Sequence, residues 1–305
     1  MVFIHGWPDT SAMWVNQFAE FCGDENEYFC VAPSWIDYHP DVRPSQKMPL
    51  RWSDQRQEFE NILFHDLELT DITYVIFDAG VPVGSQLLYT QPDLISQVII
   101  MDIPMLYFSD SIGNKKLDPI GTLEMSFPYQ QNNIQAYRNQ DDALMEYNLN
   151  VTLGGAAPCQ YCQIAPLATH GGVGSRTGWL YTEYVRTEPS PWYVDFFTAG
   201  SSSDMTETAT TTPPIIPFDE WELSFIPTFP KDVPVLYLWG EKNHQVPEWF
   251  QWIDNHAAHD GVSTYQQINN TDHWIMYHQP TMVNTLMRDW LGSITTKKKM
   301  KKKTM

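Results

Sequence analysis

The sequence is poor in cysteine and offers no obvious metal site. It has 4 cysteines in 305 residues. Cys159 and Cys162 form a Cys-x-x-Cys pair, but no second pair of ligands follows at the spacing of a zinc finger. We therefore expect no metal ion and interpret these residues as ordinary thiols.

Positive charge is also scarce. The chain has 18 Lys and Arg against 37 Asp and Glu, a net charge of −19. Six of the basic residues are lysines near the C-terminus, so the rest of the chain holds 12 basic residues and has a net charge of −25. Such a surface repels the phosphates of nucleic acids and anionic lipids, which excludes nucleic acid as a partner of the body.

The basic tail, residues 293–305, is open to several interpretations. Its lysine run could contact RNA, an anionic membrane or an import receptor. A frayed and solvated end is the simpler expectation, and we predict that this segment is disordered. The lysines are Lys297, Lys298, Lys299, Lys301, Lys302 and Lys303.

Long hydrophobic runs are missing as well. No apolar stretch approaches the ~20 residues of a membrane-spanning helix, and no signal peptide accompanies the glycosylation sequons at Asn150 and Asn269. The default expectation is a soluble, cytoplasmic protein. With 43% hydrophobic and 14% aromatic residues, the chain nevertheless has ample material for a buried core.

Hydrophobic patterns predict strands that alternate with helices. The expected strands are 1–4, 30–32, 72–77, 98–101, 233–239 and 265–268, and the expected helices are 11–21, 52–67, 83–91, 249–256 and 281–291. This alternation predicts an α/β fold with a mostly parallel sheet and helices on both faces. In such a fold, functional side chains gather at the carboxyl ends of the strands. His5, Asp78 and Asp102 each follow directly after an expected strand.

The pattern breaks between residues 104 and 232. Segment 154–178 is rich in Gly, Ala and Pro, and segment 198–217 is rich in Ser, Thr and Pro. We expect a core formed by 1–103 and 233–292, with 104–232 inserted as a mainly helical cap. A strand at the extreme N-terminus that delivers a functional loop is unusual and suggests that upstream strands are missing.

Three short motifs occur in a characteristic order. They are His5-Gly6-Trp7-Pro8-Asp9, Asp78-Ala79-Gly80, and Asp272-His273-Trp274 with Pro280 shortly after. With an insertion between the halves, this order resembles the α/β-hydrolase superfamily. Within it the chain is similar to the epoxide hydrolase and haloalkane dehalogenase branch, over residues 1–103 and 233–292.

The resemblance implies an aspartate nucleophile and no cofactor. Asp78, on a sharp strand-to-helix turn, would attack an electrophilic carbon and form an alkyl-enzyme ester, and His273 would activate water to hydrolyse it. The backbone N–H groups of Trp7 and Ala79 would form the oxyanion hole. The simpler alternative for Asp78 is a turn or N-cap aspartate. His5 is expected at the substrate site, as a structural hydrogen-bonding residue of its loop and not as a catalyst.

The chain departs from the family pattern at two places. The elbow normally has a small residue two positions before the nucleophile, and this chain has Ile76 there. We therefore expect one side of the turn to be crowded. The usual position of the acid that orients the histidine is occupied by Asn243, which can hold an imidazole but cannot stabilise its charge. Some relatives carry the acid after the preceding strand, so we predict Asp102 in that role.

Neighbouring residues suggest the substrate class. Haloalkane dehalogenases have a tryptophan after the nucleophile and fluoroacetate dehalogenases an arginine, whereas this chain has Ala79. That favours epoxides or related small apolar electrophiles, with Trp274 in the substrate pocket and Tyr181, Tyr184 or Tyr193 of the cap as proton donor. No Gly-x-Ser-x-Gly occurs, which disfavours a serine hydrolase.

A second interpretation belongs to another class. The chain could be a non-catalytic relative that keeps the fold for binding, as Asn243, Ile76 and the abrupt N-terminus suggest. A dehalogenase-like hydrolase is a further alternative. The sequence does not indicate an oligomeric state.

Overall fold

The computed structural model describes residues 1–6, 11–23, 28–34, 52–78, 80–102, 232–242, 247–271 and 273–304. The expected cap lies outside the described residues except for Asp232, and so does the Cys159–Cys162 pair.

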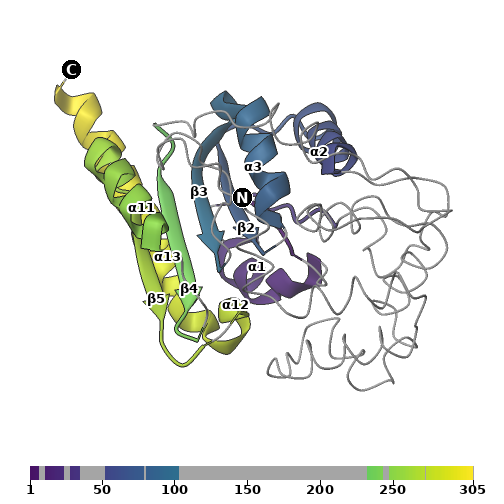
Figure 1. Ribbon diagram of the computed structural model, residues 1–305. Helices are drawn as coiled ribbons and strands as arrows, with labels where there is room; N and C mark the ends of the chain where they lie inside the picture. Colours follow the sequence, from purple (N-terminus) through teal and green to yellow (C-terminus); the bar gives the residue numbers. More distant parts are fainter. Residues whose placement is uncertain are drawn as a thin grey trace, which may run out of the picture.

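The centre of the fold is a parallel sheet whose spatial order follows the chain order (Figure 1). Its five strands, each paired in parallel with the next, are β1 (Val2–Ile4), β2 (Ile72–Phe77), β3 (Ile95–Met101), β4 (Val235–Gly240) and β5 (Thr264–Ile268). This confirms the predicted α/β class and the parallel sheet. The short strand expected at 30–32 is a single parallel bridge between Val31 and Val2.

The central strands are buried on both sides. Every residue of β2 and β4 is buried, as expected for parallel strands covered by helices on each face. Strand β3 begins at Ile95, three residues before the predicted start. The prediction started too late because the polar pair Ser96 and Gln97 interrupts the hydrophobic run.

Helices cover the two faces of the sheet in separate groups. On one face, α1 (Val15–Phe21), α12 (Ile275–His278) and α13 (Pro280–Thr304) pack in a core cluster with Phe3 and Phe77. On the other face, α3 (Gly80–Thr90) lies over β2, with α2 (Trp52–Glu60) beside it, and α11 (Pro247–Asp260) contacts β5 (Figure 1). The predicted arrangement of helices on both faces is therefore confirmed.

Several helix boundaries differ from the sequence prediction. The first helix opens with a 3-10 turn, Ser11–Trp14, and α2 continues as a π-helix, Asn61–Asp66. Helix α11 is longer than expected, and a 3-10 turn, Pro92–Leu94, precedes β3. The basic segment, predicted to be disordered, continues α13 as far as Thr304.

A disulfide that the sequence analysis did not predict links Cys22 to Cys30. Cys22 follows α1, and Cys30 precedes the bridge residue Val31, whose N–H donates to the carbonyl of Met1 at 2.9 Å. The bond thus ties the end of α1 to the segment that lies beside β1. The sequence had given no indication of a bond between these two cysteines.

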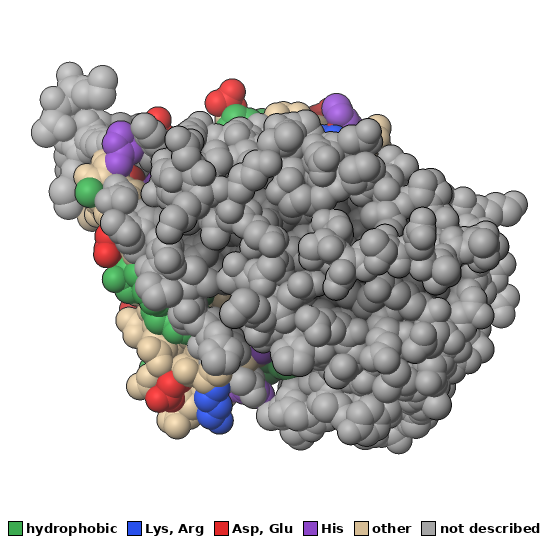
Figure 2. Space-filling model, in the orientation of Figure 1, with side chains coloured by type: hydrophobic (Ala, Val, Ile, Leu, Met, Phe, Trp, Pro, Cys, Tyr) green, Lys and Arg blue, Asp and Glu red, His purple; other side chains and the backbone are tan. Residues whose placement is uncertain are grey.

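The visible described surface is mixed in character. Figure 2 shows acidic, hydrophobic and histidine side chains close together at the left of the view, and the atoms that cover most of this face are not described. The large exposed hydrophobic side chains of the described ranges lie on separate segments: Val15, Phe29, Leu67 and Met282. None of the described helices combines the length and apolar character that a membrane span requires.

Candidate active site

Asp78 stands at the turn between β2 and α3 in a left-handed backbone conformation. Its φ is 50°, and its carbonyl accepts the N–H of Val81 at 2.9 Å as α3 begins. A left-handed conformation is unusual for a residue with a Cβ and marks a sharp turn. The turn is also packed tightly, because a Cβ on Gly6 would lie 2.3 Å from the Cβ of Asp78. Glycine at position 6 therefore lets the loop after β1 approach the buried carboxylate.

Asp102 occupies a similar turn at the end of β3. Its φ is 67°, and its N–H donates to the carbonyl of Leu238 on β4 at 2.8 Å. The residue is 4% exposed. The adjacent strands β2 and β3 thus each present a buried aspartate at the carboxyl edge of the sheet.

His273 lies between these two carboxylates. Its Nδ1 donates to Oδ2 of Asp102, and its Nε2 is 3.3 Å from Oδ2 of Asp78. The side chain of His273 is 22% exposed, whereas that of Asp78 is 8% exposed. Residues from three distant parts of the chain form one continuous acid–imidazole–acid arrangement.

Two aromatic rings hold the imidazole in place. The ring of Phe77 lies 4.7 Å from that of His273 at an angle of 43°, and the ring of Trp274 lies 4.7 Å away at 85°. Phe77 precedes Asp78 in the chain and Trp274 follows His273 directly, so sequence neighbours of the two residues confine the imidazole. Trp274, predicted to bind substrate, is 8% exposed.

The electrostatic surroundings favour the imidazolium form of His273. Burial by itself disfavours the charged ring, but the negative charge and hydrogen bond of Asp102, and then those of Asp78, outweigh it and raise the pKa of His273 well above its ordinary value. The ring is thus a cation between two carboxylates. Loss of either negative charge would lower the pKa of His273 and favour the neutral imidazole, which can accept a proton.

His5 has the opposite electrostatic character. It is fully buried, and its Nδ1 donates to the carbonyl of Gly6 at 2.9 Å. Burial lowers the pKa of His5 to about 4, against the opposing effects of the Gly6 carbonyl and the Asp78 charge. The ring is therefore neutral near pH 7, which agrees with the structural hydrogen-bonding role predicted for it.

The structure describes only part of the predicted site. It brings together Asp78, Asp102 and His273, with His5 and Trp274 nearby. The other predicted residues lie outside the described residues: Trp7, Ala79, Tyr181, Tyr184, Tyr193 and Asn243. Among the described residues, no group of three His, Cys, Asp or Glu side chains could hold a metal ion.

The expected crowding at Ile76 is relieved by its environment. A Cβ placed on Gly84 of α3 would lie 2.6 Å from Cγ2 of Ile76, so the bulky side chain fills the space that Gly84 leaves. Tyr237 of β4, which was not among the predicted site residues, donates its hydroxyl to the backbone carbonyl of Asp102 at 2.9 Å. A polar aromatic residue inside a fully buried strand was the available signal.

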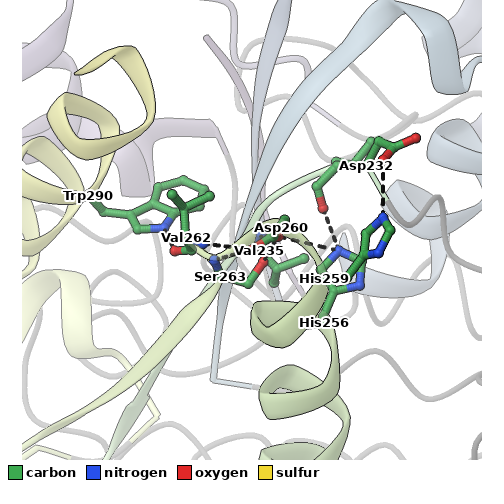
Figure 3. A network of polar contacts seen from close by, with 9 residues as sticks. Asp232, Val235, His256, His259, Asp260, Val262, Ser263 and Trp290 are labelled. Carbon is green, nitrogen blue, oxygen red and sulfur yellow. Dashed lines mark hydrogen bonds and ion pairs between the residues drawn. The ribbon is translucent and has the colours of Figure 1, made fainter. Parts of the chain in front are cut away.

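A second polar network lies at the opposite, amino ends of β4 and β5 (Figure 3). His256 of α11 donates to the carbonyl of Val233 at 2.7 Å, and Asp260 accepts the N–H of Ser263 at 2.8 Å. The hydroxyl of Ser263 accepts the N–H of Val235 at 2.9 Å. These bonds join the end of α11 to the starts of β4 and β5, so we interpret this network as structural.

Comparison with known proteins agrees with this geometry. The family model described as the alpha/beta hydrolase fold matches residues 1–280. A comparison with curated protein sequences finds no significant match.

Among solved structures, a mutant of an epoxide hydrolase from Bacillus megaterium is similar, with 18% identity and a TM-score of 0.57 over 96% of this chain and 93% of that one. A loop variant of a haloalkane dehalogenase from Bradyrhizobium elkanii has 16% identity and a TM-score of 0.59, over 98% and 90%. A thermophilic esterase from Thermogutta terrifontis has 14% identity and a TM-score of 0.56, over 96% and 89%. At these identities the solved structures show the shared fold, and the family match shows that the chain belongs to the α/β-hydrolase fold family.

Proposed function

We propose that the protein is a cofactor-independent hydrolase that opens small apolar epoxides through a covalent ester on Asp78. The observation that carries the proposal is the arrangement of carboxylates on both nitrogens of His273, Asp78 at Nε2 and Asp102 at Nδ1. An imidazole held in this way can act as a base next to Asp78, while Asp102 orients its ring.

In the first step, a carboxylate oxygen of Asp78 attacks an epoxide carbon. The carbon–oxygen bond breaks, its electron pair stays on the epoxide oxygen, and that oxygen takes up a proton. Tyr181, Tyr184 and Tyr193 are the candidate donors in the cap segment. The product is an ester between Asp78 and the hydroxyalkyl group.

In the second step, water hydrolyses the ester. The water attacks the carbonyl carbon of the Asp78 ester while His273 accepts its proton. The oxyanion is stabilised by the backbone N–H groups of Trp7 and Ala79. Its collapse breaks the bond to the alkyl oxygen, which takes the remaining hydroxyl proton of the intermediate, so that a diol is released, the carboxylate is restored and His273 is again protonated. Asp102 holds the imidazole and compensates its positive charge.

The charges of the site make the two steps compatible. Asp78 contributes to the raised pKa of His273 in the free enzyme. Formation of the ester removes this negative charge, so the pKa of His273 falls. Its proton then passes to the tyrosinate that the first step left, which restores the tyrosine and leaves a neutral imidazole as the base. The nucleophile thereby controls the protonation of its own partner.

The substrate class rests on Ala79 and on the relatives. A residue that would cradle a halide after the nucleophile is missing from the sequence, which favours an epoxide over a haloalkane. An epoxide hydrolase and a haloalkane dehalogenase are both among the similar structures, so haloalkanes are the natural comparison substrate.

Trapping of the ester tests the proposal. The wild type, His273→Gln and Asp78→Asn are incubated with aryl and alkyl epoxides and with haloalkanes, and the Asp78 peptide is then analysed by mass spectrometry. We expect an adduct equal in mass to the epoxide that accumulates in His273→Gln, turns over in the wild type and does not form in Asp78→Asn. Folded His273→Gln protein that forms no adduct with any epoxide would refute the proposal, and an adduct with haloalkanes alone would favour a dehalogenase.

A further inference from the structure

We infer that Tyr237 is a positioning residue for the site, because its hydroxyl fixes the backbone from which Asp102 reaches His273. Tyr237 belongs to β4 and is fully buried. Its hydroxyl donates to the backbone carbonyl of Asp102 at 2.9 Å, across 135 positions in the sequence.

The bond acts on a residue with an unusual backbone. Asp102 has left the sheet with a φ of 67°, a conformation that residues with a Cβ adopt only when their surroundings hold it. Its N–H is held by the carbonyl of Leu238 at 2.8 Å and its carbonyl by the hydroxyl of Tyr237. Two consecutive residues of β4 thus hold both polar backbone groups of Asp102.

The hydroxyl of Tyr237 is itself held firmly. Its ring stacks on Trp239 with centroids 5.2 Å apart and an angle of 17° between the planes. Trp239 packs in turn against Phe250 of α11 at 4.9 Å and Tyr265 of β5 at 5.9 Å. The ring therefore has little freedom, and the hydroxyl is presented at a fixed point at the edge of the sheet.

The effect on His273 is indirect but short. The carboxylate of Asp102 contacts Nδ1 of His273, and Nε2 of the same ring faces Asp78. A turn of the Asp102 backbone would move its carboxylate away from Nδ1 and leave the imidazole free to rotate. Catalytic geometry tolerates such shifts poorly, since a displacement of about 1 Å can cost on the order of a hundredfold in rate.

The test uses Tyr237→Phe, which keeps the ring stack and removes only the hydroxyl. Tyr265→Phe is the matched control, because it removes a hydroxyl from the same aromatic cluster. Proton NMR follows the Nδ1–H resonance and the titration of His273 in both variants. We expect Tyr237→Phe to move this resonance upfield and lower the pKa of His273, and Tyr265→Phe to leave both unchanged.

A kinetic measurement extends the test and rests on the proposed function. Tyr237→Phe should lower kcat by about tenfold with KM changed by less than about twofold, the pattern of a group that acts on the chemical step. In an Asp102→Asn background, the same substitution should have little further effect on His273, because the residue that Tyr237 positions no longer carries a charge.

The outcomes separate the two proposals. If Tyr237→Phe shifts the His273 resonances while the wild type forms no ester, the positioning role stands and the proposed reaction falls. If Tyr237→Phe lowers thermal stability but leaves the resonance and titration of His273 as in the wild type, Tyr237 is only a packing residue and the inference is overturned.

Discussion

The Cγ2 methyl of Ile76 occupies the space that a side chain on Gly84 would need. A Cβ on Gly84 would stand 2.6 Å from that methyl and 3.1 Å from Cε1 of Tyr74. The elbow at Asp78 therefore accepts a branched residue two positions before the turn because the facing turn of α3 has no side chain. The larger side chain of this pair is on the strand, at Ile76, and the smaller is on the helix, at Gly84.

The first prediction concerns this pair. An exposed helical Gly→Ala substitution stabilises by about 1 kcal/mol, but Gly84→Ala forces a methyl into Ile76 and should destabilise by about 1–3 kcal/mol. Gly292→Ala in α13, where nothing lies within 4 Å of the added Cβ, is the matched control and should stabilise. Urea unfolding measures both. Ile76→Ala should reduce the cost of Gly84→Ala; a cost that is the same in both backgrounds would exclude the direct clash.

The second prediction concerns the charge on His273. Asp102→Asn should lower the pKa of His273, and Asp78→Asn should lower it less, because the contact with Asp102 contributes more. Since the folded pKa is raised, the stability from this ion pair is full below about pH 6.5 and lost as pH rises through the folded pKa. NMR titration of the imidazole resonances checks the order. A larger fall in Asp78→Asn than in Asp102→Asn would contradict it.

The third prediction concerns acid sensitivity caused by His5. Its folded pKa of about 4 lies below the ordinary value, so the unfolded chain takes up this proton first on acidification. Stability is full above about pH 6.5 and falls by about 3 kcal/mol as pH decreases to 4. His5→Asn, which cannot titrate, should show a smaller loss between pH 6.5 and 4.5 in urea unfolding. Parallel pH profiles for the two proteins would exclude His5 as the cause.

The fourth prediction concerns the disulfide between Cys22 and Cys30. A cross-link over a loop this short lowers the entropy of the unfolded chain and thereby raises the free energy of unfolding by about 2–3 kcal/mol. Reduction of the wild type should therefore lower its Tm, and the Cys22→Ser/Cys30→Ser double variant should match the reduced wild type. A reductant should have no further effect on the double variant. If the reductant lowers its Tm equally, other cysteines are responsible.

The sequence determined the elements of the core and the order of the motifs. Buried parallel strands are continuous hydrophobic runs, so residues 72–77 were predicted to the residue. The positions of Asp78 and His273 after strands also follow from local patterns. The catalytic roles of these residues remain predictions.

Only the tertiary structure decided which distant groups meet. The family resemblance suggested Asp102 as the acid of His273 and left Asn243 at the usual position of that acid. The contact itself spans 171 positions and depends on strand order and register, and the same holds for Tyr237 and Asp102, a contact that was not predicted. The relief of Ile76 by Gly84 and the pairing of Cys22 with Cys30 depend on how helices lie on the sheet and beside it. Local patterns report which face of an element is apolar; they do not report what lies opposite that face, because packing between elements is set by the whole chain at once.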